Sequence, residues 1–274
     1  MESIILTRYL YNLDEVRHSL FIEILKKNHE AALYWCYELY WSGYKEETFE
    51  FLIDHLYEKL FNKDEKFGKR IKKEYEDWKK DNTKNEKIGN ITINLCYRNF
   101  EISKLINEYY KLNCKEKEKD KKETNLYINL NYKDINKYDT IYNENGRYKV
   151  LREVCNYELR SEYNELFSCE LDKDRQRNLV FYNWEYYAFK CPYWKEAFES
   201  YSGKIKQGRI VFDNEELLED FYNKYELEID EQPLEVQEKV LGINNKKQKT
   251  MSEFAKEFNG VLKTSKLKKK LIIN

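Results

Sequence analysis

The stretch AALYWCYELYWSGY, residues 31–44, carries aromatic side chains at six of its fourteen positions. On a helix, Tyr37 and Tyr40 share one face, whereas Tyr34 and Trp35 lie off that face. Such a helix is apolar nearly all round, which is typical of a helix sandwiched between others. We therefore predict a central core helix. The alternative is that the off-face aromatic side chains form a surface for stacking or for a protein partner.

Helical periodicity continues on both sides of this stretch. Apolar residues recur at helical spacing over residues 14–27, 45–62 and 64–80, and two short helices fit residues 88–112. Antiparallel pairs of such helices resemble a HEAT-like stack, although we find no sequence repeat of the usual period.

A different pattern appears in GKIKQGRIVF, residues 203–212. Polar and apolar residues alternate here around Gln207-Gly208, which predicts a small β-hairpin. The fold class that we expect is therefore mainly α: an irregular antiparallel helical array, with HEAT-like helix pairs and one small β-hairpin near 203–212.

The charge pattern divides the chain into four regions. Residues 115–123, KEKEKDKKE, form a mixed-charge run of the kind found in solvated linkers. We predict an N-terminal helical region (1–112), a charged and irregular linker (113–145), a C-terminal helical region with the hairpin (146–242) and a basic, partly frayed tail (243–274). Whether the two helical regions share one core stays open.

Composition narrows the classes of function. Lys and Arg number 49 and Asp and Glu number 50, so the net charge is −1 and any nucleic-acid binding must come from a local basic patch. None of the six cysteines forms a Cys-x-x-Cys pair, and no stretch approaches the roughly 18 apolar residues of a membrane span. We expect a soluble protein with free thiols in a reducing compartment, without a signal peptide.

Motifs for catalysis and for cofactors do not occur in the sequence. The histidines His18, His29 and His55 show no metal-ligand spacing with one another or with a cysteine, so we predict no metal site. Gly-rich nucleotide-binding loops and the common hydrolase motifs are also missing. We therefore predict a protein that is not an enzyme and that uses no cofactor.

A second aromatic cluster is FYNWEYYAFKCPYW, residues 181–194. It is either a further core segment or, with the basic residues nearby, a surface that stacks bases and contacts phosphates. The candidate nucleic-acid-binding residues are Arg175, Arg177, Tyr182, Tyr186, Lys190 and Tyr193. The lysines of the tail could also touch phosphate or an acidic partner, or they could simply solubilise a frayed end.

Two stretches resemble proteins, mostly uncharacterised, that are encoded by mimivirus-like giant DNA viruses of protists. These stretches are LDEVRHSLFIEILKKNHEAALYWCYELYWSGY (13–44) and FYNKYELEIDEQPLEVQEKVLG (221–242). The resemblance covers about residues 1–242 and brings no catalytic motif. It implies a viral protein that works in the cytoplasm of an infected host cell, in a viral factory or in a virion.

This viral context implies a specific role. Giant viruses carry homologues of the cap-binding protein and the helicase of translation initiation, and a helical array is similar to the middle domain of initiation factor 4G. Such scaffolds grip the cap-binding protein through a Tyr-x-x-x-x-Leu-Φ motif, where Φ is hydrophobic, and Tyr34, Leu39 and Tyr40 match it loosely. The leading hypothesis is a non-enzymatic helical scaffold whose protein partner is a viral cap-binding protein or helicase. The alternatives are an RNA- or DNA-binding module and a structural component of the virion.

Overall fold

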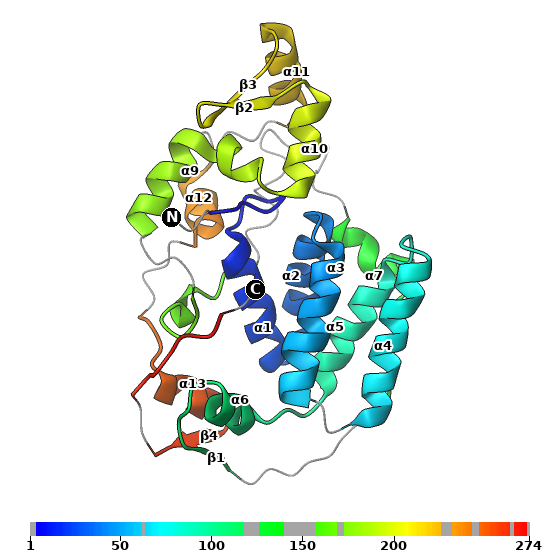
Figure 1. Ribbon diagram of the computed structural model, residues 1–274, viewed down its shortest axis with the longest axis vertical. Helices are drawn as coiled ribbons and strands as arrows, with labels where there is room; N and C mark the ends of the chain where they lie inside the picture. Colours follow the sequence, from blue (N-terminus) through cyan, green and yellow to red (C-terminus); the bar gives the residue numbers. More distant parts are fainter. Residues whose placement is uncertain are drawn as a thin grey trace.

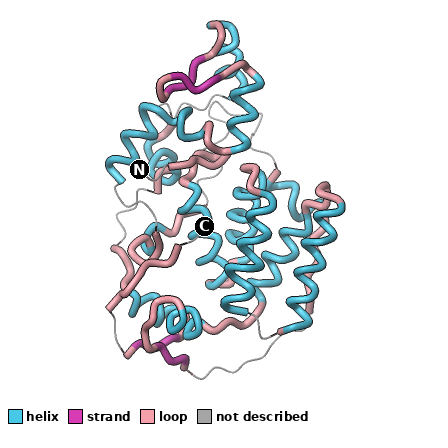
Figure 2. Tube along the Cα trace, viewed as in Figure 1, coloured by secondary structure: helices cyan, strands magenta, loops and turns pink. Residues whose placement is uncertain are grey.

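The computed structural model describes residues 4–61, 64–117, 126–139, 157–168, 173–225, 232–242, 247–263 and 266–272. Helices make up most of this structure, and the described strands form two antiparallel sheets of two strands each (Figure 1). Figure 2 shows the helices throughout the body of the molecule and the strands near opposite ends of its long axis. The predicted fold class, a mainly α array with a small β-hairpin, is confirmed.

The body of the molecule is a set of packed helices. In chain order they are α1 (Leu13–Leu25), α2 (His29–Trp41), α3 (Lys45–Glu50), a π-helical segment (Phe51–Phe61), α4 (Glu65–Lys80) and α5 (Glu86–Tyr97). Helix α1 packs on α2, α2 on α5, and α5 on α4. Side chains of Asn12, Asn28 and Asp64 accept hydrogen bonds from the first amides of α1, α2 and α4. These caps explain why helices begin at those positions.

Helix α2 is the central core helix that its aromatic sequence predicts. The side chains of Trp35 and Tyr37 are fully buried. The Trp35 ring meets Tyr11 edge-on at a centroid distance of 5.0 Å, and Tyr37 stacks on Tyr138 at 5.2 Å. Aromatic pairs of this geometry add to the free energy gained from burial alone.

An extended segment, residues 126–130, lies along α5. Asn94 accepts a hydrogen bond from the Ile128 amide at 2.9 Å and donates to the Ile128 carbonyl at 2.7 Å, while Asn90 accepts from the Leu130 amide at 2.7 Å. Helix α7 (Tyr132–Ile135) and a 3-10 turn (Asn136–Tyr138) follow. These residues are therefore packed, unlike the irregular linker expected for 113–145, because two asparagines of α5 satisfy the backbone of the extended segment.

The lower end of the molecule in Figure 1 joins two segments that are far apart in the sequence. Its elements are α6 (Ile102–Glu108), β1 (Cys114–Glu116), α13 (Met251–Glu257) and β4 (Gly260–Leu262). Strand β1 pairs antiparallel with β4, and Cys114 lies opposite Leu262. Farther along, Leu271 is buried, and its amide donates to the Leu166 carbonyl at 2.9 Å. Leu271 therefore anchors part of the region expected to be a basic, partly frayed tail (243–274), whereas residues 266–270 are exposed.

The upper end contains the predicted hairpin. Its elements are α9 (Lys173–Ala188), α10 (Pro192–Ser200), β2 (Lys204–Lys206), β3 (Arg209–Val211) and α11 (Glu215–Tyr225), and α12 (Leu234–Val240) follows. Gln207 and Gly208 form the turn with φ angles of 53° and 77°. Positive φ at both positions is what a two-residue type I′ hairpin turn requires.

The described parts of both predicted helical regions share one core. The Trp194 indole of α10 donates to the Thr7 carbonyl at 3.0 Å. His18 of α1 lies with its ring centroid 4.1 Å from that of Phe167, close to the 3-10 turn Ser161–Tyr163. Buried residues from Ile4 to Leu271 form one continuous cluster, so the described parts of the two regions pack together.

Candidate nucleic-acid interface

The three residues predicted to bind a protein partner are buried in the core. Tyr34, Leu39 and Tyr40 are 6%, 2% and 0% exposed. Tyr34 stacks on Tyr157 at a centroid distance of 3.9 Å, and the Tyr40 hydroxyl accepts a hydrogen bond from the Trp78 indole at 2.8 Å. A partner protein could reach these side chains only if α2 left the core.

The predicted nucleic-acid cluster on α9 and α10 is only partly a surface. Tyr182 is 87% exposed, whereas Lys190, just past the end of α9, folds back with its ammonium 4.5 Å from the ring centroid of Tyr186. Burial lowers the pKa of Lys190. The backbone amide of Tyr193 donates to the Ser42 carbonyl, which fixes Tyr193 against the helical body.

The two arginines of this cluster lie at the start of α9. Arg175 is exposed, and Arg177 places its guanidinium 5.3 Å from the Phe181 ring centroid. The helix kinks at Asn183, where the backbone leaves helical geometry. Tyr182 therefore stands beside the kink, one turn or more beyond the arginines, and the six predicted residues do not form one compact site.

The hairpin brings further cations close to this cluster, and sequence reasoning did not include them. The Asn183 amide donates to the Gly208 carbonyl at 3.1 Å, so the turn rests on α9. Lys206 lies directly opposite Arg209 in the strand register, and both are exposed. Like charges in opposed positions repel. No ion pair within the described residues neutralises either one.

A stronger concentration of positive charge lies at the other end of the molecule. We define the basic end as the described residues 101–117, 247–263 and 266–272. It contains twelve lysines and five glutamates, a net charge of +7 in a chain whose total is −1. Pairing of β1 with β4 brings the first two segments together.

Tyr109 fixes the third segment of the basic end. Its hydroxyl donates to the Lys270 carbonyl at 3.0 Å and accepts from the Ile272 amide at 3.2 Å. The ammonium of Lys269 lies 3.9 Å from the Tyr109 ring centroid, a cation–π contact. The tail lysines are thereby held beside the end of α6, in a segment that runs from the lower end of the molecule toward its middle (Figure 1). The exposed lysines of the basic end include Lys111, Lys115, Lys117, Lys256, Lys263, Lys268, Lys269 and Lys270.

Most glutamates of the basic end are already engaged by other groups. Glu116 accepts hydrogen bonds from the amide and the hydroxyl of Ser103, and Glu253 closes a capping box at the start of α13. Glu257 pairs with Lys26, which follows the last residue of α1, and with Lys249. Its pKa is lowered, because hydrogen bonds from Lys249 and Tyr163 outweigh the raising effect of burial. The other lysines therefore keep their positive field.

Two further properties of the described residues bear on the class of protein. No group of three or more His, Cys, Asp and Glu side chains in the described ranges could hold a metal ion. None of the helices described is long and apolar enough to cross a membrane.

A comparison of the chain with protein-family models, curated proteins and solved structures found no match.

Proposed function

We propose that this protein is a non-enzymatic nucleic-acid-binding protein and that the basic end contacts the phosphates. The observation that carries the proposal is the net charge of +7 in three segments that the fold brings together, in a chain whose total is −1. A local field of this kind attracts a polyanion and speeds its association.

The basic end offers lysines that can contact phosphates, but it has no exposed aromatic side chain within the described residues on which a base could stack. Its aromatic side chains in the described ranges are buried or half-buried, and Tyr109 is covered by Lys269. Contacts to phosphate position a protein on nucleic acid but carry little sequence information. We therefore propose binding that depends weakly on sequence and strongly on salt. In the infected cell of the proposed giant-virus context, the ligand would be viral or host RNA or DNA.

The test compares two double variants that remove the same charge. Lys268→Ala/Lys270→Ala acts at the basic end, and Lys206→Ala/Arg209→Ala acts at the hairpin. Binding of labelled single-stranded and duplex oligonucleotides of mixed sequence is followed by fluorescence anisotropy at several salt concentrations. The basic-end variant should bind more weakly, and the slope of log K against log salt should fall by about 2, since each lost phosphate contact removes about 0.9.

Each outcome of this comparison has a distinct meaning. The hairpin variant should keep the affinity and the salt slope of the unaltered protein. If the hairpin variant loses as much as the basic-end variant, the predicted α9 surface takes part and the basic end is not the main interface. If no oligonucleotide binds in a salt-dependent way, the proposed function is wrong.

A scaffold that binds a protein partner is the second candidate, and the upper end favours it. Tyr182 is 87% exposed, and Ile205 and Val211 of the hairpin are each 44% exposed. Exposed apolar side chains on a two-stranded hairpin are suited to pairing with a strand of a partner. A cap-binding protein or helicase that copurifies after nuclease treatment and is lost in Tyr182→Ala would support this function, whereas recovery of nuclease-sensitive material alone would contradict it.

A further inference from the structure

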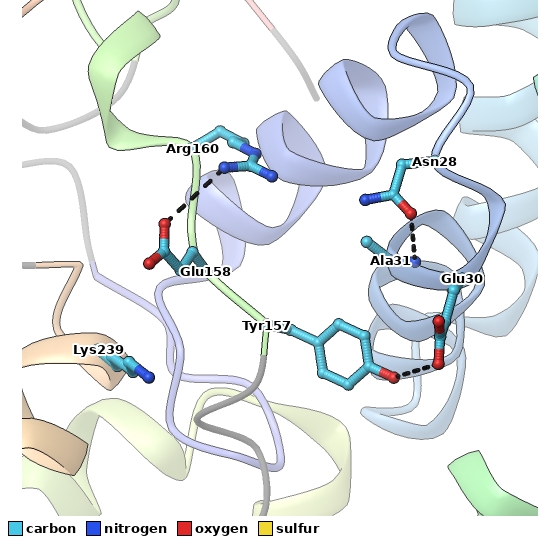
Figure 3. A pocket seen from close by; sticks show the side chains of 7 residues that line it. All are labelled: Asn28, Glu30, Ala31, Tyr157, Glu158, Arg160 and Lys239. Carbon is cyan, nitrogen blue, oxygen red and sulfur yellow. Dashed lines mark hydrogen bonds and ion pairs between the residues drawn. The ribbon is translucent and has the colours of Figure 1, made fainter.

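A cavity of about 460 Å³ lies where three segments distant in the sequence meet. The amino end of α2, the segment 157–160 and Lys239 of α12 form its wall (Figure 3). None of these residues belongs to the basic end. The volume falls within the range of small-molecule sites in proteins, and the side chains around it are mainly polar or charged.

One side of the cavity is lined by hydrogen-bond donors. The Arg160 side chain is fixed in position, because its Nε donates to the buried carboxylate of Glu23. Its Nη1 forms a long ion pair with Glu158 at 3.9 Å, and the guanidinium lines the cavity beside these two carboxylates (Figure 3). Asn28 uses Oδ1 to accept from the Ala31 amide and cap α2, which leaves its NH₂ group for the cavity (Figure 3).

The remaining wall supplies acceptors and a fixed ring. Tyr157 stacks on buried Tyr34 with an interplanar angle of 7°, so the core sets its orientation. Its hydroxyl donates to Glu30 Oε1 at 3.5 Å, and the same oxygen pairs with Lys137 at 3.7 Å, so Oε2 of Glu30 is the acceptor for a ligand. The carboxylates of Glu30 and Glu158 lie on either side of the Tyr157 ring in Figure 3, where each can accept from an N–H or O–H group of a ligand.

We propose that this cavity binds a small molecule that carries a carboxylate or phosphate at one end and N–H or O–H donors at the other. The oxyanion lies between Arg160 and Asn28, because a guanidinium edge matches the geometry of two oxyanion oxygens. The donors of the ligand reach Glu30 and Glu158. The wall carries two cationic side chains, Arg160 and Lys239, and two carboxylates, Glu30 and Glu158, so its formal charges balance. A balanced wall suits a ligand of mixed polarity better than a polyanion.

The test uses the full chain, calorimetry and thermal-shift measurements with four probes. Inorganic phosphate and acetate present the oxyanion alone, whereas ribose 5-phosphate and serine add donors. We expect a dissociation constant of about 1 mM or lower for ribose 5-phosphate or serine. Comparing the two phosphate probes with the two carboxylate probes shows which oxyanion the cavity prefers. Glu30→Gln should weaken only the probes that carry donors.

Matched capping variants separate binding from stability. Asn28→Asp keeps the helix cap, since Asp caps as well as Asn, but it replaces the donor with a negative charge. It should weaken binding of every probe by about tenfold or more. Asn12→Asp makes the same change at the cap of α1, away from the cavity, and should leave binding unchanged. Absence of binding by all four probes, or unchanged affinity in Asn28→Asp, would overturn the proposal. Neither result depends on nucleic-acid binding.

Discussion

The buried ion pair between Arg8 and Glu38 joins three parts of the chain. Nε of Arg8 lies 3.0 Å from Glu38 Oε2, and the two side chains are 3% and 0% exposed. Arg8 also donates to the carbonyls of Tyr138 at 2.5 Å and Asp139 at 3.2 Å. The second oxygen of Glu38 accepts from the Tyr9 amide at 3.0 Å. The pair therefore ties the amino-terminal segment and α2 to residues 138–139.

Glu38→Leu should destabilise the protein strongly. The substitution leaves the guanidinium of Arg8 buried beside two carbonyl oxygens and the Tyr9 ring, without a carboxylate. Removal of one partner of a buried pair costs about 3–5 kcal/mol. At roughly 2 °C per kcal/mol for a chain of this length, Tm should fall by about 6–10 °C. Glu58→Leu is the control, because Glu58 and Lys72 form an exposed pair at 2.8 Å. Loss of that pair should cost under about 1 kcal/mol.

The measurement is a double-mutant cycle followed by circular dichroism in urea and on heating. The variants are Arg8→Met, Glu38→Leu and both together. The double variant should lose less free energy of unfolding than the sum of the single variants, since it leaves no uncompensated charge in the core. It should still be less stable than the unaltered protein, because the Tyr9 amide and two carbonyls lose their partners. A loss below about 1 kcal/mol in Glu38→Leu, or additive single effects, would refute this reasoning.

Three further predictions concern the core, the acid response and a thiol. Gly89→Ala should cost roughly 1–3 kcal/mol in urea unfolding, because its Cβ would lie 2.4 Å from the Tyr37 hydroxyl; unchanged stability would contradict this packing. The pKa of Glu257 is lowered from 4.5, so its stabilising contribution is complete above about pH 4.5 and is lost as the pH falls through the folded pKa. The stability difference between the unaltered protein and Glu257→Gln should therefore shrink at acid pH, and a constant difference would show that the carboxylate does not act through its charge. Burial raises the pKa of Cys36 to about 12, so iodoacetamide should label Cys36 only after unfolding, as located by mass spectrometry.

The helical class and the central helix could be predicted because they depend on local pattern. The aromatic residues of 31–44 occur all round a helix, and such a helix has only one stable place, between other helices. The hairpin also followed from local chemistry, since Gln207-Gly208 supplies the turn and the flanking residues alternate. In each case the side chains that decide the structure are neighbours along the chain.

The proposed interface could not be predicted in the same way. The lysines of the tail were visible in the sequence, but nothing local indicated that Cys114–Glu116 pairs with Gly260–Leu262. Likewise, Tyr34 loosely matches the tyrosine of the Tyr-x-x-x-x-Leu-Φ motif, but the match does not show whether the Tyr34 ring faces solvent. Tyr34 is buried because Tyr157 stacks on it from a segment more than a hundred positions away.

The sequence by itself therefore determined the mainly helical class, the aromatic core helix and the turn at Gln207-Gly208, because intrinsic periodicity and backbone preference act over a few residues. Only the tertiary structure decided where charge gathers and where a cavity forms. Those properties depend on pairing between distant segments. The described residues of 247–272 carry a net charge of +6 and residues 101–117 carry +1, and these charges add only once β4 lies beside β1. The polar cavity likewise exists only because residues 157–160 cross the amino end of α2.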